Sequence, residues 1–229
     1  MSGPARGVIY VATGAAHVGA ARASARSVRR TNPALGITLF CDRTIDAPEF
    51  DRVAPIERPH VRSKVEYLAR SPYAQTLYLD TDTRVAGDLG DLFRLLERFD
   101  LAAAHRRRQP ARVLAASDRE VPASCPEFNS GVVLYVDNPA VREFLAGWLD
   151  AYRSEGAAAD QISFRKALWR SDLRIAVLPA RFNTRRYSWI DHWRRRGPPP
   201  AILHVNRFHP SKCGSGLRGF LRRHAGPVP

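Results

Sequence analysis

Residues 76–83 read TLYLDTDT, and this stretch decides the fold. Its first half is a short apolar run typical of a buried strand, and Asp80 and Asp82 follow that run directly. Because side chains two apart in an extended chain point to the same side, both carboxylates can face one site. Carboxylate oxygens are the ligands that Mg²⁺ and Mn²⁺ prefer. We therefore expect a buried strand that ends at a divalent-cation site.

The segment before this stretch alternates between strand and helix patterns. Residues 8–12 and 37–41 are apolar runs typical of strands, and residues 20–30 form a helix of small residues between them. Small or polar residues follow both runs. This β-α-β order predicts a parallel sheet that binds ligands at the carboxyl ends of its strands.

Lys64 stands out in the segment that leads to the aspartates. Ser63 and Glu66 have the spacing of a capping box, so a helix is expected to begin near Ser63 with Lys64 in its first turn. A cation at that end of a helix is unfavourable against the helix dipole. The placement indicates that Lys64 has a task other than supporting the helix.

The segment after residue 83 continues the alternation. Asp88 is expected to cap a helix over residues 89–99, and residues 105–126 have the pattern of a long polar loop. The further elements that we expect are strands at 101–104, 132–136, 175–178 and 202–205, and helices at 139–152 and 160–169. The prediction is one α/β domain over residues 1–205, with a mixed, mostly parallel central sheet flanked by helices, and a basic C-terminal extension over residues 206–229.

The net charge of +14 comes almost entirely from arginine, because the only lysines are Lys64, Lys166 and Lys212. An arginine excess favours anionic partners such as nucleic acid, phospholipid or phosphate-bearing small molecules. A coding bias toward arginine and alanine accounts for it equally well. Charge alone therefore does not identify the partner.

Composition and cysteine spacing exclude several classes of protein. A chain of 229 residues that is 45% hydrophobic and 25% charged has the composition of a folded domain. Its three cysteines lie far apart and show no zinc-binding spacing, so we expect no disulfide framework and a cytoplasmic location. No apolar run reaches the length of a membrane span. The membrane contact that the sequence allows is a weak, peripheral one through its basic segments.

Several motifs together resemble the core of the GT-A-fold nucleotide-diphospho-sugar transferases. KVEYL at 64–68 and LYLDTDT at 77–83 carry the resemblance first. FNSGVV at 128–133, Asp160-Gln161, Phe182-Asn183 and His204 then follow in the family's order. The sequence is most similar to glycosyltransferase family 8, the group of glycogenin and the bacterial lipopolysaccharide sugar transferases. The resemblance spans most of residues 7–205, and it implies a nucleotide-binding half over 7–82 and an acceptor half over 83–205.

The resemblance implies a metal site and a catalytic site. Asp80, Asp82 and His204 would bind Mn²⁺ or Mg²⁺, and an imidazole ligand favours Mn²⁺. Lys64, Asp160 and Gln161 would act on the donor sugar and its reacting carbon. The residues expected to bind the donor are Thr13, Gly14, Asp42, Lys64, Thr81, Asn129, Ser130, Gly131 and Lys212.

Within that set, Thr13 and Gly14 are expected to line the nucleoside pocket, and Asp42 is expected to contact the base or the ribose. Gly131 would let the backbone approach the transferred sugar. The family's His-x-x-Gly-x-x-Lys-Pro motif is altered here, because the residues after His204 read VNRFHPSK. Lys212, two places later than the family's lysine, or Arg207 is expected to reach the diphosphate as part of a lid.

The expected function is metal-dependent transfer of a hexosyl group from a nucleoside-diphosphate sugar to an acceptor hydroxyl. By resemblance the donor is a UDP-sugar and the reaction retains the anomeric configuration. In an inverting reaction, Asp160 or Glu127 would be the general base. The acceptor is a glycan, a lipid-linked molecule or a small molecule.

Two other functions remain open. A haloacid-dehalogenase-like phosphatase would use Asp80 as nucleophile and Asp82 as acid/base, but the motif then lies unusually late, after a complete β-α-β unit. A basic nucleic-acid-binding module would use the arginine runs at 106–108 and 194–196. No nucleic-acid fold signature accompanies those runs, so we expect no nucleic-acid partner.

Overall fold

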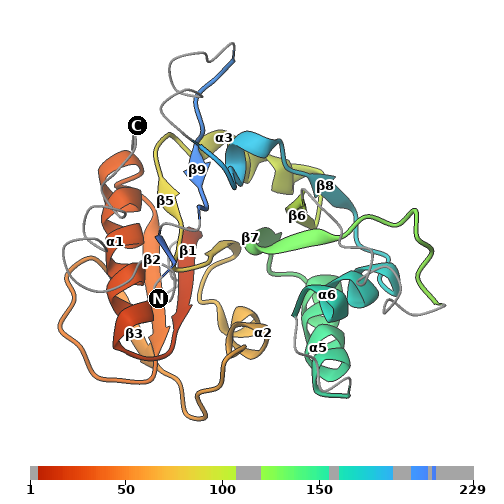
Figure 1. The fold of residues 1–229 in the computed structure, drawn as a ribbon, viewed down its shortest axis with the longest axis horizontal. Coiled ribbons are helices and arrows are strands. Elements are labelled where there is room, and N and C mark those ends of the chain that lie inside the picture. Colours follow the sequence, from red (N-terminus) through yellow and green to blue (C-terminus); the bar gives the residue numbers. More distant parts are fainter. Residues whose placement is uncertain (1–4, 107–119, 155–159, 188–196, 206–207, 210–229) are drawn as a thin grey trace.

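A seven-stranded sheet forms the centre of the computed structural model, which describes residues 5–106, 120–154, 160–187, 197–205 and 208–209 (Figure 1). Its strands are β1 (Arg6–Ala12), β2 (Gly36–Cys41), β3 (Arg52–Pro55), β4 (Gln75–Leu79), β6 (Leu101–His105), β7 (Phe128–Val136) and β8 (Ile175–Val177). A second sheet pairs β5 (Arg84–Val85) with β9 (Ile202–Leu203). The helices are α1 (Ala15–Thr31), α2 (Lys64–Tyr67), α3 (Gly90–Arg94), α5 (Pro139–Ser154) and α6 (Asp160–Trp169), with single 3₁₀ turns η1 (Leu68–Arg70), η2 (Leu95–Glu97) and η3 (Ala180–Phe182).

The strand order is β3-β2-β1-β4-β7-β6-β8, and β7 is the one reversed strand of this sheet. It pairs antiparallel with β4 and with β6, whereas the remaining neighbours pair parallel. The predicted mixed, mostly parallel sheet is therefore confirmed. The reversal has a local effect, because Leu79 at the end of β4 lies opposite Val132 in the middle of β7, and the first half of β7 continues past that end. Residues 129–131 thus lie beside Asp80.

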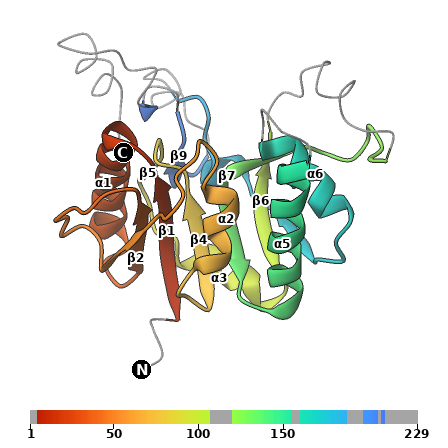
Figure 2. The same cartoon turned by 90° about the horizontal axis from the view of Figure 1, so that it is seen from below.

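Helices cover both faces of the sheet (Figure 2). One core cluster joins α1 and α3 to the residues of β1 that include Val8 and Tyr10. The other joins α2, α5 and α6 to the opposite face, which includes Ile9. Successive β1 side chains belong to different clusters because side chains alternate along a strand. Trp148 of α5 is fully buried, and its ring lies 4.6 Å from that of Phe164.

Several expected boundaries differ from those in the structure. The helix expected at 20–30 begins earlier and spans Ala15–Thr31. The predicted capping box does not form, because the Ser63 hydroxyl bonds the backbone of His60 and Glu66 pairs with Arg70. Helix α2 is accordingly a single turn that continues into η1.

The other boundary differences are small. Asp88 lies two residues before Gly90, the first residue of α3, and accepts a hydrogen bond from the Gly90 amide; the N-cap is Leu89. The last two expected strands end at Val177 and Leu203, shorter than expected. Across the described ranges, no helix has both the length and the apolar character that crossing a bilayer requires.

Candidate metal and donor-binding site

Asp80, Asp82 and His204 converge at the carboxyl ends of β4 and β9. One potential ligand atom from each lies within 4.8 Å of the others. The His204 Nε2 atom is 3.1 Å from Asp82 Oδ1 and 3.7 Å from Asp80 Oδ2. The structure thus brings together the three side chains that the sequence analysis named as metal ligands.

The His204 ring is held by a chain of two amides. The Asn183 amide nitrogen donates to Asn129 Oδ1 at 2.9 Å, which leaves the Asn183 oxygen 2.9 Å from His204 Nδ1. An amide oxygen accepts only, so it requires the imidazole proton on Nδ1. The Nε2 lone pair then faces the two carboxylates. This is how second-shell partners orient a metal-binding histidine.

This geometry fits a divalent cation. A lone pair on Nε2 and the Asp82 carboxylate are both acceptors, and they need a shared cation at 3.1 Å, either a proton or a metal ion. Two carboxylates with one imidazole suit Mn²⁺ and Mg²⁺, and the nitrogen favours Mn²⁺. Burial opposes ionisation of Asp82, but when Nε2 carries a proton in place of a metal ion, its hydrogen bond to Asp82 and the charge of the ring outweigh burial and lower the pKa of Asp82 to about 2. Asp82 is therefore an anionic ligand at neutral pH.

Gly131 leaves the space that this site needs. A Cβ atom at Gly131 would overlap His204 Cε1 and Asp80 Oδ2. The Gly131 carbonyl also accepts the Asp80 amide proton at 2.8 Å, which ties β7 to the start of the aspartate motif. We expected this glycine to allow close approach of the sugar, whereas the close approach that the structure shows is to two of the three candidate ligands.

Lys64 bridges the candidate metal ligand Asp80 and a second carboxylate, Asp160. Its Nζ atom lies 2.7 Å from Asp160 Oδ2 and 3.3 Å from Asp80 Oδ1, and it donates to Ser130 Oγ at 3.1 Å. The Ser130 hydroxyl in turn donates to Asp160 Oδ2 at 2.6 Å. Lys64 is almost fully buried, so these ionic contacts explain the first-turn lysine that its helix disfavours.

Asp160 is held as a carboxylate by the same contacts. Burial opposes its ionisation, but the charges of Lys64 and Arg62 outweigh burial and lower the pKa of Asp160 below its usual range. The Arg62 Nε atom lies 3.4 Å from Asp160 Oδ1. A carboxylate stabilised in this way is a weak base. Its geometry suits positioning Lys64 and a ligand better than accepting a proton.

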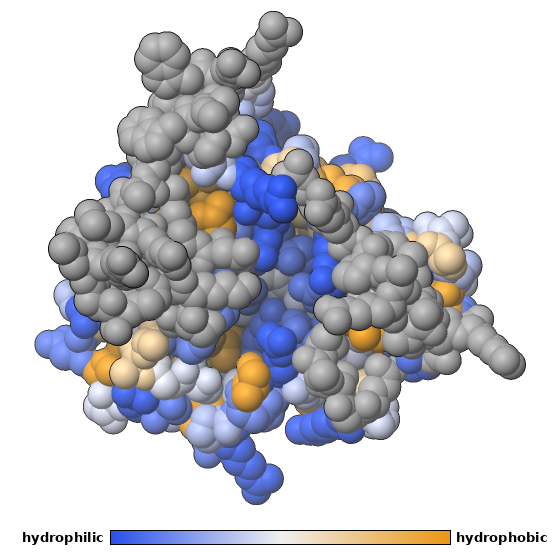
Figure 3. All heavy atoms as spheres, viewed as in Figure 1, coloured by the Kyte–Doolittle hydropathy of each residue, from blue (hydrophilic) through white to orange (hydrophobic). Residues whose placement is uncertain are grey.

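These side chains line a cavity of about 290 Å³. Figure 3 shows hydrophilic residues gathered along the middle of the face seen in Figure 1. The expected residues that line the cavity are Thr13, Lys64, Asp80, Thr81, Asp82, Asn129, Gln161 and His204. Ser130 and Gly131 are buried: Ser130 contacts Lys64, and Gly131 lies against the candidate ligands Asp80 and His204.

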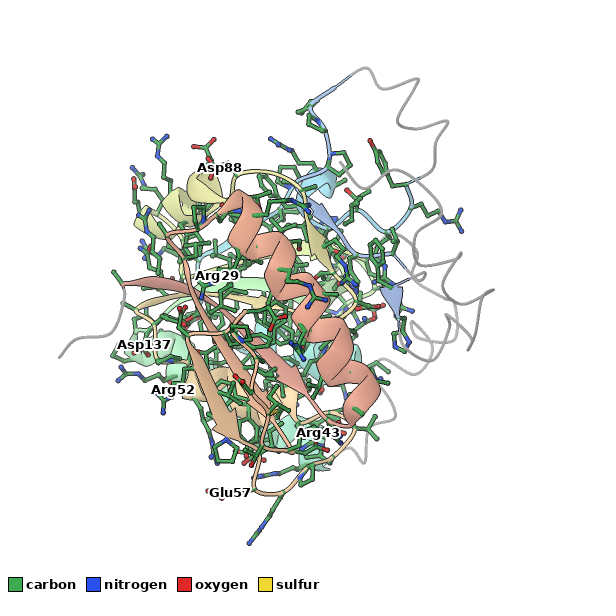
Figure 4. All side chains as sticks on the ribbon, turned by 90° about the vertical axis from the view of Figure 1, so that its left-hand side faces the viewer. Arg29, Arg43, Arg52, Glu57, Asp88 and Asp137 are labelled. Atoms are coloured by element: carbon green, nitrogen blue, oxygen red, sulfur yellow. The ribbon has the colours of Figure 1, made fainter. Side chains whose placement is uncertain are left out.

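Two further expected residues, Gly14 and Asp42, do not line this cavity. Gly14 has a φ of 82°, a conformation that favours glycine, and its amide donates to Asp42 Oδ2 at 2.9 Å. Asp42 therefore shapes the turn between β1 and α1, and its hydrogen bond with Arg43 lowers its pKa. Arg43 lies beside the start of α1 in Figure 4. Arg207 and Lys212 lie outside the described residues.

Five further histidine and arginine residues line the cavity and were not expected there: His17, His60, Arg62, Arg185 and His209. The His17 Nδ1 atom is 3.3 Å from Thr81 Oγ1, and its ring meets that of His209 edge to face. The positions of two of them, Arg62 and Arg185, explain why the sequence did not predict them. Arg62 precedes Lys64 by two residues and Arg185 follows Asn183 by two, so the neighbouring motifs pointed to these segments but not to these side chains.

Comparison with known proteins identifies the fold of the chain. Neither a family model nor a curated protein sequence matches the chain. Three similar solved structures are the glycosyltransferase GlyE of Streptococcus pneumoniae TIGR4 (TM-score 0.60, 22% identity, 87% of this chain and 54% of that chain), the galactosyltransferase LgtC (0.61, 15%, 97% of each chain) and mouse xyloside xylosyltransferase 1 (0.55, 14%, 88% and 97%). The chain spans about half the length of the pneumococcal protein. It has the α/β fold of these glycosyltransferases.

Proposed function

We propose that the chain is a metal-dependent glycosyltransferase of the GT-A class that uses a nucleoside-diphosphate sugar. The observation that carries the proposal is the convergence of Asp80, Asp82 and His204 beside the Lys64–Asp160 ion pair in one cavity. The similar structures support it, and LgtC was solved with donor and acceptor sugar analogues. The resemblance to family 8 supports a UDP-sugar donor, a hexosyl group and retention of configuration.

The proposed reaction exchanges one bond at the anomeric carbon. The bond to the diphosphate oxygen breaks and its electron pair stays on the diphosphate, while the acceptor hydroxyl oxygen forms the new bond. In a retaining reaction the departing oxygen lies on the attacked face, so it can take the hydroxyl proton. A divalent cation held by Asp80, Asp82 and His204 would neutralise the charge of the diphosphate.

The chain's own residues would position the donor around this bond. Lys64 would donate hydrogen bonds to the sugar hydroxyls from its place between Asp80 and Asp160. Gln161 follows Asp160 in the sequence and lines the cavity, and it would contact the sugar near its anomeric carbon. Thr13 and Thr81 line the same cavity and would contact the nucleoside and the ribose. Fixing the donor in this way lowers the entropic cost of reaching the reactive geometry.

We also propose a division of labour along the chain. Residues 7–82 would form most of the donor half and residues 83–205 most of the acceptor half. The acceptor hydroxyl would belong to a glycan, a lipid-linked molecule or a small molecule. Composition and cysteine spacing support a cytoplasmic location with weak membrane contact through basic segments.

A thermal-shift screen tests the proposal. Nucleoside diphosphates would be added singly, each with and without Mn²⁺, and at least one should raise the melting temperature in a Mn²⁺-dependent way. Ligand at about 100 times its Kd stabilises the folded state by roughly 2.7 kcal/mol. Asp80→Asn should abolish the dependence on Mn²⁺. The proposal is wrong if no nucleoside diphosphate shifts the wild-type protein.

The same preparation distinguishes the two rival functions. Release of phosphate from p-nitrophenyl phosphate, lost in Asp80→Asn, would favour the phosphatase. Salt-dependent binding of DNA without binding of any nucleotide sugar would favour the nucleic-acid module.

A further inference from the structure

A second cavity, of about 450 Å³, lies next to the candidate metal site. His105 and Val177, the last residues of β6 and β8, line it, so it opens at the same edge of the sheet as Asp80. Its other wall is the segment that contains Asn183, Arg185 and Arg186. Apart from Arg185, the residues that line it do not line the donor cavity.

Two residues join the cavities. Arg185 lines both of them, and Asn183, which lines the second, bonds the ring of His204. Thr184 between them is fixed to the last strand, because its amide donates to the Ile202 carbonyl and its carbonyl accepts from the His204 amide, both at 2.9 Å. The wall shared by the cavities is therefore anchored to a candidate metal ligand. A molecule in the second cavity would lie beside the donor.

The lining of the second cavity is basic and apolar. His105, Arg185 and Arg186 are its ionisable side chains, and no described residue that lines it is acidic. Across the described ranges, no carboxylate lies within ion-pair distance of Arg185 or Arg186. Leu178 and Val177 supply apolar surface, and Val177 is 52% exposed although it is a large hydrophobic residue. The donor cavity differs in that it is lined by Asp80 and Asp82, and Arg62 there pairs with Asp160.

We propose that the second cavity is the acceptor subsite and that it takes a sugar bearing an anionic group, either a carboxylate or a phosphate. The proposal rests on the glycosyltransferase function proposed above. Arginine binds both kinds of anion through paired N–H donors, and the apolar surface fits the C–H face of a sugar ring. Of these two cavities, Arg186 lines only the second, whereas Arg185 lines both and would face both substrates.

Calorimetric titration of three sugars tests the charge preference. Glucose 6-phosphate, glucuronic acid and glucose would be titrated into protein saturated with Mn²⁺ and the nucleoside diphosphate that binds best. At least one anionic sugar should bind about tenfold more tightly than glucose or better. Whether glucose 6-phosphate or glucuronic acid binds more tightly distinguishes a phosphate-bearing from a carboxylate-bearing acceptor. Equal binding of all three, or no binding of either anionic sugar, would overturn the proposal.

Matched variants locate the binding. Arg186→Gln should weaken binding of the anionic sugar by about two- to fivefold, a reduction typical of an exposed ion pair. Arg181→Gln removes the same charge from the same segment but outside both cavities, and it should leave this binding unchanged. Unchanged binding in Arg186→Gln would exclude this cavity as the site.

Substitutions of Val177, which lines the second cavity, distinguish the effect of charge on binding from the effect of side-chain shape. Val177→Asp and Val177→Asn are isosteric, and both replace an exposed side chain at the end of an edge strand. The aspartate should weaken binding of the anionic sugar relative to the asparagine, because only the aspartate repels it. The same affinity in both variants counts against the proposal. If nucleoside diphosphates do not bind the wild-type protein at all, the proposed enzyme function fails instead, and the sugar titrations can still be read without them.

Discussion

Replacing Gly131 by alanine places a methyl group where the Asp80 carboxylate and the His204 imidazole meet. Neither neighbour can move away freely, since the Asp80 amide bonds the Gly131 carbonyl and His204 is held by Asn183. The φ of Gly131 does not lie in the left-handed region, so alanine fits its backbone conformation. Any loss of stability or of Mn²⁺ affinity in Gly131→Ala must therefore come from overlap with the two candidate ligands.

Overpacking of this kind costs about 1–3 kcal/mol. For a chain of this size, each 1 kcal/mol lowers the melting temperature by roughly 2–4 °C, so Gly131→Ala should melt about 2–12 °C below wild type. Displaced ligands should also weaken Mn²⁺ binding about 10- to 100-fold, as disturbed second-shell contacts do. Scanning calorimetry measures the first effect, and titration calorimetry with Mn²⁺ measures the second without any assay of activity.

Gly147→Ala is the matched control. No atom lies within 4 Å of the position of a Cβ at Gly147, which is in the middle of α5. Alanine there should leave Mn²⁺ binding unchanged and raise stability by up to about 1 kcal/mol, because glycine is a poor helix former. If Gly131→Ala binds Mn²⁺ as tightly as wild type and melts at the same temperature, the assignment of Gly131 to the metal site is wrong.

The remaining predictions concern the metal ligands, their support and the acid stability of the fold. Asp82→Asn should lower transfer to an acceptor by about 100-fold or more, measured as released nucleoside diphosphate, and wild-type turnover would contradict the metal site. Asn183→Ala should weaken Mn²⁺ binding about 10-fold or more, because it frees the His204 ring; unchanged affinity would show that the amide chain is not needed. Hydrogen bonds from Arg174 hold the pKa of Asp100 at about 2, so this pair stabilises the fold above about pH 4 and ceases to do so as the pH falls toward 2. The melting temperatures of wild type and Asp100→Asn should therefore converge between about pH 5 and about pH 2, and a constant difference would exclude this ion pair as the cause.

The aspartate motif was predictable because it depends on local rules. An apolar run marks β4, and two-residue periodicity puts Asp80 and Asp82 on one side of its end. His204 could be named only through resemblance, since no local pattern joins it to the aspartates. The predicted extra task of Lys64 is explained by its contacts with Asp80 and Asp160, which lie in other parts of the sequence.

The parts that could not be predicted depend on packing between distant segments. The Ser63–Glu66 capping box fits its sequence rule, but tertiary contacts gave Ser63 and Glu66 other partners. Asp42 was placed at the ligand by topology, yet its hydrogen bond with Gly14 uses it to shape a turn. Arg185 carries no motif, and its place between two cavities follows from the pairing of Thr184 with the last strand.

The small β5–β9 sheet has a consequence for the late part of the chain. It holds His204 next to the segment that follows Asp82, although the two residues are far apart in sequence. An ion bound by both would act as a reversible cross-link between early and late segments. Adding Mn²⁺ should then slow amide hydrogen exchange at Ile202 and Leu203 much more than in β1, whose exchange is governed by the main sheet. The concentration of metal would thereby set the local stability of β9, whether or not a sugar is being transferred.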